Sequence, residues 1–355
     1  MESRTSLASS RSRRQNVFAA LSPQLNFGCL GAANITPGAL VNPSRTHPEL
    51  VLYAVAARDA KRAEEFAKEH GFQKSYDLID DPNVHVVYNP RPNGLHFEWT
   101  MKALKGGKHV LLEKPAIDTA AEAAQIYAFA ARKNLIVLEA FHYLFSQFPS
   151  CDPTKTILES EELGAIKSVT ASLTTPAGTT KDNDSLEAVP TANAVPYSSR
   201  PQHKQVDKMF TATLALEKDI IGELHSNLSE PKMLGIIPRI PRLTATVQCE
   251  GGTVQIFNFL IPSYYHYITV TPGSGKARRV EKAYSFNGTA KGEDWWTTYR
   301  YQLEAFVDKV QRRTPQTWLE PQDTIDNMKW IEEIYAKDGF GSRPASNHVY
   351  GEDEK

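Results

Sequence analysis

Residues 26–36, which read NFGCLGAANIT, decide the fold of the first half of this chain. The run from Asn26 to Leu30 is apolar, as expected of a buried strand, and Gly31 follows at the point where the chain would turn into a helix. A GxGxxG pattern laid on Gly31 finds alanine at the second glycine position and threonine at the third. Gly31 still permits a tight turn, and Ala33 is small enough for a phosphate to approach the backbone. This predicts a phosphate-binding turn, with an ordinary strand–turn–helix corner as the alternative, and its candidate residues are Gly31, Ala32, Ala33 and Ile35.

The sequence around this stretch repeats the same alternation of strand and helix. Residues 60–70 and 119–133 have apolar side chains on one helical face, which predicts two amphipathic helices. Strands that alternate with helices form βαβ units and a parallel sheet. Residues 25–148 are therefore predicted to be an α/β Rossmann domain with a doubly wound parallel sheet. The other apolar runs that predict its strands are 50–57, 84–88, 109–112 and 135–138.

Residues 149–345 have a different pattern, because their β-rich stretches follow one another without intervening helices. Such a succession forms an antiparallel sheet, and Gly251-Gly252 predicts a tight hairpin turn within it. A helix with Tyr299 and Phe306 on one stripe comes next, and a last helix is expected near 324–336. The second domain is therefore predicted to be α+β with an open, mainly antiparallel sheet. Its predicted strands are 166–174, 209–216, 220–225, 243–249, 253–259 and 265–271.

The composition favours a small-molecule partner. Lys and Arg total 40 against 41 acidic residues, so the chain lacks the basic excess that nucleic-acid and membrane-surface binders carry. No apolar run is long enough to cross a bilayer. The cysteines Cys29, Cys151 and Cys249 have no CxxC spacing, which argues against a metal site or a disulfide framework and fits the cytoplasm.

The two ends of the chain are predicted to be tails. Residues 1–24 carry arginines and many serines with a single acid, Glu2. We favour a disordered tail, and a mitochondrial targeting peptide is the alternative. Residues 346–355 are expected to form a C-terminal tail.

Two arginines indicate which dinucleotide the first domain would bind. The second strand ends in Ala56-Ala57-Arg58-Asp59, with Arg62 one helical turn later. NAD enzymes usually place an acid at this strand end to hold the ribose 2′-OH, whereas a guanidinium matches a 2′-phosphate. The pattern favours NADP, and solvated surface arginines are the alternative.

Two further segments leave the carboxyl ends of predicted strands, where open α/β sheets bind their ligands. The first runs from Tyr88 through Pro90 to His96, and the second is Glu113-Lys114-Pro115. Lys114 is a candidate proton donor or electrostatic clamp, because a partly buried lysine is readily tuned. A surface turn is the alternative interpretation of this lysine.

Four motifs then occur in the order typical of one superfamily. They are Gly-x-x-Gly-Ala-Ala-x-Ile from Gly28, Tyr-x-Pro-x-Pro-Asn-x-Leu-His from Tyr88, Gly-Lys-His-Val-Leu-x-Glu-Lys-Pro from Gly107, and Glu-Ala-Phe-His-Tyr from Glu139. Together they resemble the glucose–fructose oxidoreductase/inositol dehydrogenase (Gfo/Idh/MocA) superfamily. Within it, the sequence is similar to the branch of dimeric dihydrodiol dehydrogenases and fungal NADP-dependent D-xylose 1-dehydrogenases. The resemblance covers about residues 26–344.

This resemblance implies hydride transfer to NADP from a D-xylose-like sugar or from a dihydrodiol or other secondary alcohol, without a metal. Lys114 matches the active-site lysine of the family, and Pro115 matches a proline that shapes the nicotinamide site. The open sheet would cover the nicotinamide and pair in a homodimer. The residues that match positions lining the cofactor cleft are Asn93, His96, Glu113 and His142.

The chain also departs from the family pattern. The branch usually reads Tyr-Ile-Pro-Leu-Pro-Asn where this chain has Asn89 and Arg91. After Asp184 the family continues with an Asp-x-Gly-x-Tyr motif that supplies an acid/base tyrosine or histidine, and with a helix. Here Ser185 follows directly, and Tyr197 is the only tyrosine in residues 185–205. A loss during evolution and a gap in the gene prediction are both open explanations.

These departures leave alternatives to an active sugar or diol dehydrogenase. One is a catalytically impaired, NADP-binding member of the family, and another is a tailoring oxidoreductase of a secondary-metabolite pathway. Other conspicuous residues receive structural interpretations: Trp295 and Trp296 are expected to pack as core, and Cys29 is expected to be a buried small side chain.

Overall fold

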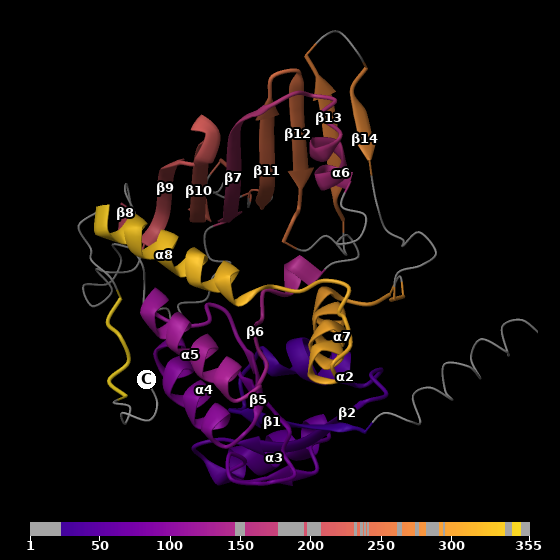
Figure 1. The fold of residues 1–355 in the computed structure, drawn as a ribbon, viewed down its shortest axis with the longest axis vertical. Helices are drawn as coiled ribbons and strands as arrows, with labels where there is room; N and C mark the ends of the chain where they lie inside the picture. The colour runs from indigo at the N-terminus through magenta and orange to yellow at the C-terminus, as the bar shows by residue number, and fades with distance from the viewer. Residues whose placement is uncertain are drawn as a thin grey trace, which may run out of the picture.

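The computed structural model describes residues 23–145, 153–176, 195–196, 207–230, 233–234, 237, 239, 241–260, 265–273, 277–281, 291–293, 295–337 and 343–348. The expected N-terminal tail up to residue 22, the Asp184–Ser185 junction and Tyr197 lie outside these residues. Figure 1 shows two sheets at opposite ends of the molecule, with helix α8 (Pro321–Lys337) running between them. Within the described part of the chain, no helix combines the length and the apolar character needed to cross a membrane.

The first sheet confirms the predicted Rossmann domain. Its strands are all parallel and lie in the order β3-β2-β1-β4-β5-β6, the doubly wound arrangement of dinucleotide-binding domains. The strands are β1 (Leu25–Leu30), β2 (Leu50–Ala56), β3 (Lys74–Ser75), β4 (Val86–Asn89), β5 (His109–Leu112) and β6 (Val137–Glu139). Its helical segments are η1 (Pro37–Val41), α2 (Asn42–Ser44), α3 (Ala60–His70), η2 (Asn93–Leu95), α4 (His96–Lys105) and α5 (Ala120–Arg132).

Two glycines explain why the first strand and its turn take this shape. A side chain at Gly28 would place its Cβ 2.9 Å from Leu78 Cδ1, so glycine is what lets the strand pack this closely. Gly31 has a φ of 118°, in the region that side chains rarely adopt, and a Cβ there would meet open space. The reason for glycine at position 31 is therefore the backbone turn that ends β1.

The second sheet confirms the predicted open, mainly antiparallel architecture. Its order is β14-β13-β12-β11-β7-β10-β9-β8, and every pair is antiparallel except β7 with β10. The predicted hairpin at Gly251-Gly252 joins β11 to β12. Its strands are β7 (Ile166–Pro176), β8 (Val195–Pro196), β9 (Asp207–Ala215), β10 (Ile221–Glu230), β11 (Arg242–Cys249), β12 (Gly252–Phe257), β13 (Tyr267–Pro272) and β14 (Arg279–Glu281). Shorter helical segments are η3 (His142–Phe145), α6 (Pro153–Glu159) and η5 (Glu217–Asp219).

The last two helices return to the first domain, although by sequence position they were grouped with the second. Helix α7 (Thr298–Val310) places Phe306 in the core of the first sheet, edge-on to Phe27 at 6.2 Å between ring centroids. An apolar stripe predicts that a helix face is buried, but not which sheet will cover it. Figure 1 shows α7 standing beside α2 at the first domain.

Helix α8 contacts both domains. On one side, the Tyr127 hydroxyl of α5 donates a hydrogen bond of 3.1 Å to Thr324 of α8. On the other, Ile334 and Tyr335 pack with Ala212 of β9. Beyond α8 the chain follows α5, where the backbone N–H of Ser346 donates to Glu122 at 2.6 Å. Ser346 is the first residue of the expected C-terminal tail, so that tail begins in contact with the Rossmann domain.

Candidate active site

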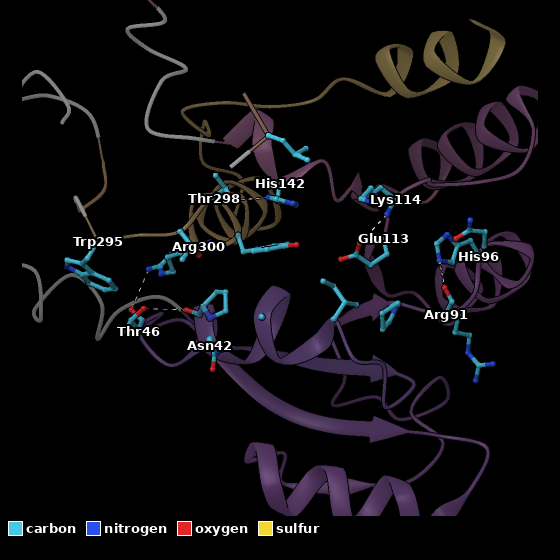
Figure 2. Close-up of a pocket in the computed structure, with 18 residues that line it drawn as sticks. Asn42, Thr46, Arg91, His96, Glu113, Lys114, His142, Trp295, Thr298 and Arg300 are labelled. Atoms are coloured by element: carbon cyan, nitrogen blue, oxygen red, sulfur yellow. Dashed lines mark hydrogen bonds between the residues drawn. The ribbon is translucent and has the colours of Figure 1, made fainter. Parts of the chain in front are cut away.

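A cavity of about 820 Å³ opens at the carboxyl edge of the first sheet and is closed on its far side by the start of α7 (Figure 2). This is the edge at which the sequence pattern predicts the candidate site, because open α/β sheets bind their ligands at the carboxyl ends of their strands. Loop residues Leu260 and Trp295 complete the wall. The residues lining it are Ile35, Gly38, Asn42, Pro43, Thr46, Pro90, Arg91, Asn93, His96, Glu113, Lys114, His142, Leu260, Trp295, Thr297, Thr298, Tyr299 and Arg300.

The cavity brings together many of the residues singled out from the sequence, but not all of them. Those in its wall are Ile35, Pro90, Asn93, His96, Glu113, Lys114 and His142. Those that do not line it are Gly31, Ala32, Ala33, Arg58, Arg62 and Pro115.

Lys114 stands at the centre of a group of titratable side chains. Its side chain is exposed to the cavity, and among the described residues no hydrogen-bond or ion-pair partner holds its ammonium group. Burial has the largest effect on the pKa values of Glu113, Glu139 and His142, and the positive charge of Lys114 acts on all three in the lowering direction. All three groups therefore lie within the electrostatic reach of Lys114. The peptide bond from Lys114 to Pro115 is cis.

Glu113 is fixed beside Lys114 by a buried tyrosine. The hydroxyl of Tyr88, which is fully buried, donates to Glu113 Oε1 at 2.7 Å. Burial raises the pKa of Glu113, while the hydrogen bond from Tyr88 and the charge of Lys114 act in the opposite direction. The carboxyl group is thus rigidly held and easier to protonate than an exposed glutamate.

Glu139 is a second buried carboxyl group near Lys114. It accepts hydrogen bonds of 2.8 Å from the backbone N–H of Ala116 and from the hydroxyl of Thr324 on α8. Burial raises its pKa to about 7, against the effect of both donors. Because Thr324 comes from α8, this contact ties the connecting helix to the active-site edge of the sheet.

His142 and Tyr299 form the opposite wall. Their rings are stacked, with centroids 4.0 Å apart, and His142 Nδ1 lies 2.8 Å from the hydroxyl of Thr298. Burial and then the charge of Lys114 lower the pKa of His142 to about 4, so its ring is neutral at neutral pH. Burial and then the charge of Glu113 raise the pKa of Tyr299 to about 12, so its phenol keeps its proton.

His96 holds two loops of the site together. Its Nε2 lies 2.6 Å from the carbonyl of Arg91, and its Nδ1 lies 2.8 Å from the carbonyl of Pro115. Burial lowers the pKa of His96, and a neutral ring donates through only one of these nitrogens. His96 therefore links the loop that carries Arg91 to the loop that carries Lys114 and Pro115.

The predicted phosphate-binding turn is joined to the start of α3. Arg62 Nη2 donates a hydrogen bond of 2.8 Å to the carbonyl of Ala32, which commits this arginine to the turn itself. Arg58 is exposed at the end of β2, next to Asp59, whose side chain caps α3. The structure thus separates two arginines that the sequence treats alike, because Arg62 is bound within the turn while Arg58 has no hydrogen-bond or ion-pair partner in the part of the chain that the structure describes.

The start of α7 is fixed by an ionic network. Glu304 contacts His47 Nε2 at 3.3 Å and Arg300 Nη1 at 2.5 Å, and it also pairs with Lys291. Arg313 binds Glu49 through both terminal nitrogens, at 2.9 and 2.7 Å. These contacts join α7 to the segment around α2, and so they position Tyr299 against the first domain.

Sequence reasoning missed several residues of the cavity wall. Tyr299 was assigned to an apolar helix stripe, and Trp295 was expected to be core but is 61 % exposed. The prediction holds for Trp296, which packs against the core, and for Cys29, which is fully buried. Arg91 carried a usable signal, because it stands where the related branch usually has leucine. Within the described residues, no three His, Cys, Asp or Glu side chains gather as a metal site.

Comparison with known proteins agrees with this geometry. Residues 25–141 match the profile of a family described as "Oxidoreductase family, NAD-binding Rossmann fold". A dTDP-3,4-didehydro-2,6-dideoxy-alpha-D-glucose 3-reductase of Saccharopolyspora spinosa is 36% identical over 153 residues, which cover 41% of this chain and 45% of that protein. The chain thus aligns with less than half of this reductase.

A second relative aligns over most of its length. The D-xylose 1-dehydrogenase (NADP(+)) 2 of Haloferax volcanii is 26% identical over 325 residues, which cover 87% of this chain and 96% of that protein. Among solved structures, a 3-ketoreductase from Actinomadura kijaniata in complex with NADP and TDP-benzene has a TM-score of 0.70 at 19% identity. That similarity covers 88% of this chain and 98% of the other, and it concerns the fold alone.

Proposed function

Since this chain belongs to the Gfo/Idh/MocA superfamily of oxidoreductases, we propose that it is an NADP-dependent dehydrogenase or ketoreductase acting on a sugar or diol. The observation that carries the proposal is the cavity, which gathers Lys114, His142 and Tyr299 at the carboxyl edge of a Rossmann sheet. The proposed reaction moves a hydride between the carbinol carbon of the substrate and the nicotinamide, and a proton between the substrate oxygen and the protein.

The residues present fit a dinucleotide. A side chain at Gly31 would meet open space at the turn after β1. The cavity begins a few residues further on, at Ile35, and includes Pro90 and Lys114 beyond the ends of β4 and β5. The turn at Gly31 to Ala33 would hold the pyrophosphate, Arg58 the 2′-phosphate, and Pro90, Asn93 and Pro115 would shape the nicotinamide side. When bound, the cofactor supplies the hydride acceptor or donor.

The proton step is assigned to Lys114 and Tyr299. Both line the cavity, and the ammonium N–H and phenol O–H are donors that can bind a substrate oxygen. Glu113 lies within electrostatic reach of both side chains and is held by Tyr88, which makes it the group that can pass a proton onward. His142 positions Tyr299 by stacking on its ring.

Arg58→Ala tests the choice of NADP. We expect the Kd for NADP to rise about tenfold or more with little change in the Kd for NAD, because a charge-assisted contact with the 2′-phosphate is lost. Cofactor fluorescence titration measures both constants. Lys61→Ala is the matched control, since Lys61 is an exposed cation three residues after Arg58, in the first turn of α3, and is paired with Glu65. An unchanged ratio of the two constants would contradict the assignment.

Tyr299→Phe tests the proton step. We expect kcat to fall by about 10²-fold with an unchanged Kd for NADP, because the ring and its stacking on His142 are kept while the proton donor is removed. Tyr301→Phe is the control, since Tyr301 is on the same helix as Tyr299 but does not line the cavity, and its hydroxyl donates to the backbone carbonyl of Glu293. Steady-state kinetics that show full activity in Tyr299→Phe would remove Tyr299 from the mechanism.

A second candidate function is NADP binding without turnover. It is favoured by the absence of the Asp-x-Gly-x-Tyr segment from the sequence after Asp184. The two candidates separate when the purified protein is titrated with NADP and then assayed with D-xylose, other aldoses and dihydrodiols. Binding together with reduction of NADP supports the enzyme, and binding alone supports the second candidate. Sequencing the transcript across the Asp184–Ser185 junction shows whether a coding segment is missing.

Two further expectations complete the proposal. A homodimer would form through the open face of the second sheet, which size-exclusion chromatography with light scattering measures directly. The expected compartment is the cytoplasm, with the mitochondrion as the alternative that the arginine-rich residues 1–24 leave open.

A further inference from the structure

We propose that Arg91 is a specificity-determining residue at the adenosine end of the dinucleotide site, where it stacks on the adenine and shares the 2′-phosphate with Arg58. This inference rests on the proposed dinucleotide-dependent function. It goes beyond it by assigning a role to a side chain that replaces the leucine usual in the related branch.

Arg91 and Arg58 occupy matching positions in the sheet. Strands β2 and β4 flank β1 in the sheet, and each arginine stands two residues beyond the end of its strand, after Ala56 and after Asn89. Because all three strands are parallel, their carboxyl ends meet at one edge. The two arginines therefore follow the strands on either side of β1, whose own end is the turn that begins at Gly31.

Arg91 is held in place through its backbone and its side chain. Its backbone carbonyl lies 2.6 Å from His96 Nε2, and its N–H donates to Asn89 Oδ1 at 3.4 Å. Its guanidinium carbon lies 3.8 Å from the centre of the Trp99 ring. An arginine that is flat on a ring loses less conformational entropy when it binds a ligand than one that is free in solvent.

Within the part of the chain that the structure describes, the Arg91 guanidinium lacks a complete set of hydrogen-bond partners. Its Nε is buried and has no hydrogen-bond partner among the described residues. Arg91 also lines the cavity, and Figure 2 shows its side chain extending away from Glu113 and Lys114. An arginine that contacted the reacting carbon would point the other way, so its place fits the end of the cofactor far from the chemistry.

The charges around Arg91 indicate that its ligand is an anion. Burial lowers its pKa, Glu98 and Asp77 raise it, and Arg58 lowers it. Glu98 is already paired with Lys102 at 2.5 Å. Two neighbouring guanidinium groups repel each other, and an anion between them removes that repulsion. A phosphate on the ribose would be such an anion.

The aromatic ring beside Arg91 indicates that the rest of the ligand is planar. Trp99 lies against the Arg91 guanidinium, whose central carbon is 3.8 Å from the centre of the ring, and in the proposed complex the opposite face would take a planar group. Guanidinium groups stack on aromatic rings, and adenine offers one at the distance from the 2′-phosphate that the dinucleotide itself fixes. Arg91 would then lie between Trp99 and the adenine.

The test uses the full chain and two nucleotides that carry no nicotinamide. Isothermal titration calorimetry gives the Kd of 2′,5′-ADP and of 5′-ADP for the wild type, Arg91→Leu and Arg91→Lys. We expect Arg91→Leu to raise the Kd of 2′,5′-ADP by about tenfold or more and the Kd of 5′-ADP by less, because both the charge-assisted contact and the stacking are lost. Arg91→Lys keeps the charge without the planar group, so its Kd for 2′,5′-ADP should lie between those of the wild type and Arg91→Leu.

Arg132→Leu is the control, because Arg132 is also an arginine over an aromatic ring, 5.7 Å from the centre of Phe129, and it does not line the cavity. Circular dichroism and thermal unfolding of each variant show whether it folds. A folded Arg91→Leu that binds 2′,5′-ADP like the wild type overturns the role of Arg91. If the wild type binds neither nucleotide, both this inference and the proposed dinucleotide site are overturned, whereas binding without turnover leaves the inference intact.

Discussion

Replacing Lys114 by alanine is expected to lower turnover by about 10²- to 10⁴-fold while leaving the Kd for NADP nearly unchanged. Lys114 is exposed in the cavity wall and, among the described residues, no partner holds its ammonium group. The variant therefore removes a group that is available to the substrate and breaks no hydrogen bond or ion pair of the lysine side chain within the described ranges. Its effect should appear in kcat and in kcat/KM together, as expected when a transition-state contact is lost.

The control for this prediction is Lys133→Ala, because Lys133 is an exposed lysine of the same domain that does not line the cavity. Lys114→Arg keeps a positive charge but changes its geometry, and it should recover little activity if proton transfer is the role of the lysine. Steady-state kinetics together with cofactor titration separate catalysis from binding. Full activity of Lys114→Ala would show that the proton is handled elsewhere.

Glu304→Ala is expected to lower the free energy of unfolding by about 3–5 kcal/mol, because it leaves a buried cation without its partner. Arg300 is 3% exposed, and its guanidinium lies 3.9 Å from the centre of the Trp296 ring. Burial disfavours the charged form of Glu304, but His47, Arg300 and Lys291 together hold its pKa at about 2. The carboxylate is therefore charged at neutral pH, and three side chains depend on it.

Urea unfolding at neutral pH measures this loss. The depressed pKa fixes the sign of the pH dependence: the stabilisation by Glu304 is present above its ordinary value of 4.5 and is lost as the pH falls toward 2. The difference in the free energy of unfolding between the wild type and Glu304→Ala should become smaller as the pH falls from 4.5 toward 2. The double variant Arg300→Met with Glu304→Leu removes both charges and should lose less stability than Glu304→Ala. Equal stability of Glu304→Ala and wild type would show that this network does not hold α7.

Much of the candidate site follows from the strand pattern. Each predicted strand of the first half is present, and the parallel arrangement brings the segments after β4, β5 and β6 to one edge. Asn93, Lys114 and His142 each follow one of these strands, and all of them line the cavity. The physical reason is that parallel strands bring residues far apart in sequence to the same edge, wherever each strand ends.

Other parts of the site depend on contacts that no local pattern encodes. Arg58 and Arg62 have the same residue type and similar sequence positions, yet Arg62 donates to the carbonyl of Ala32 and Arg58 does not. Trp295 and Trp296 are adjacent, yet the first is exposed at the cavity and the second packs on the core. In both pairs, the tertiary neighbours decide which side chain remains available to a ligand.

The sequence by itself determined that a parallel Rossmann sheet precedes an open, mainly antiparallel sheet, because hydrophobic period and glycine placement are local properties. It also determined that Lys114 stands at a strand end. Only the tertiary structure decided that α7 packs on the first domain and brings Tyr299 against His142. That choice depends on which sheet covers an apolar stripe and on ion pairs such as Arg313 with Glu49, which join residues distant in the chain and form only when the whole fold is assembled.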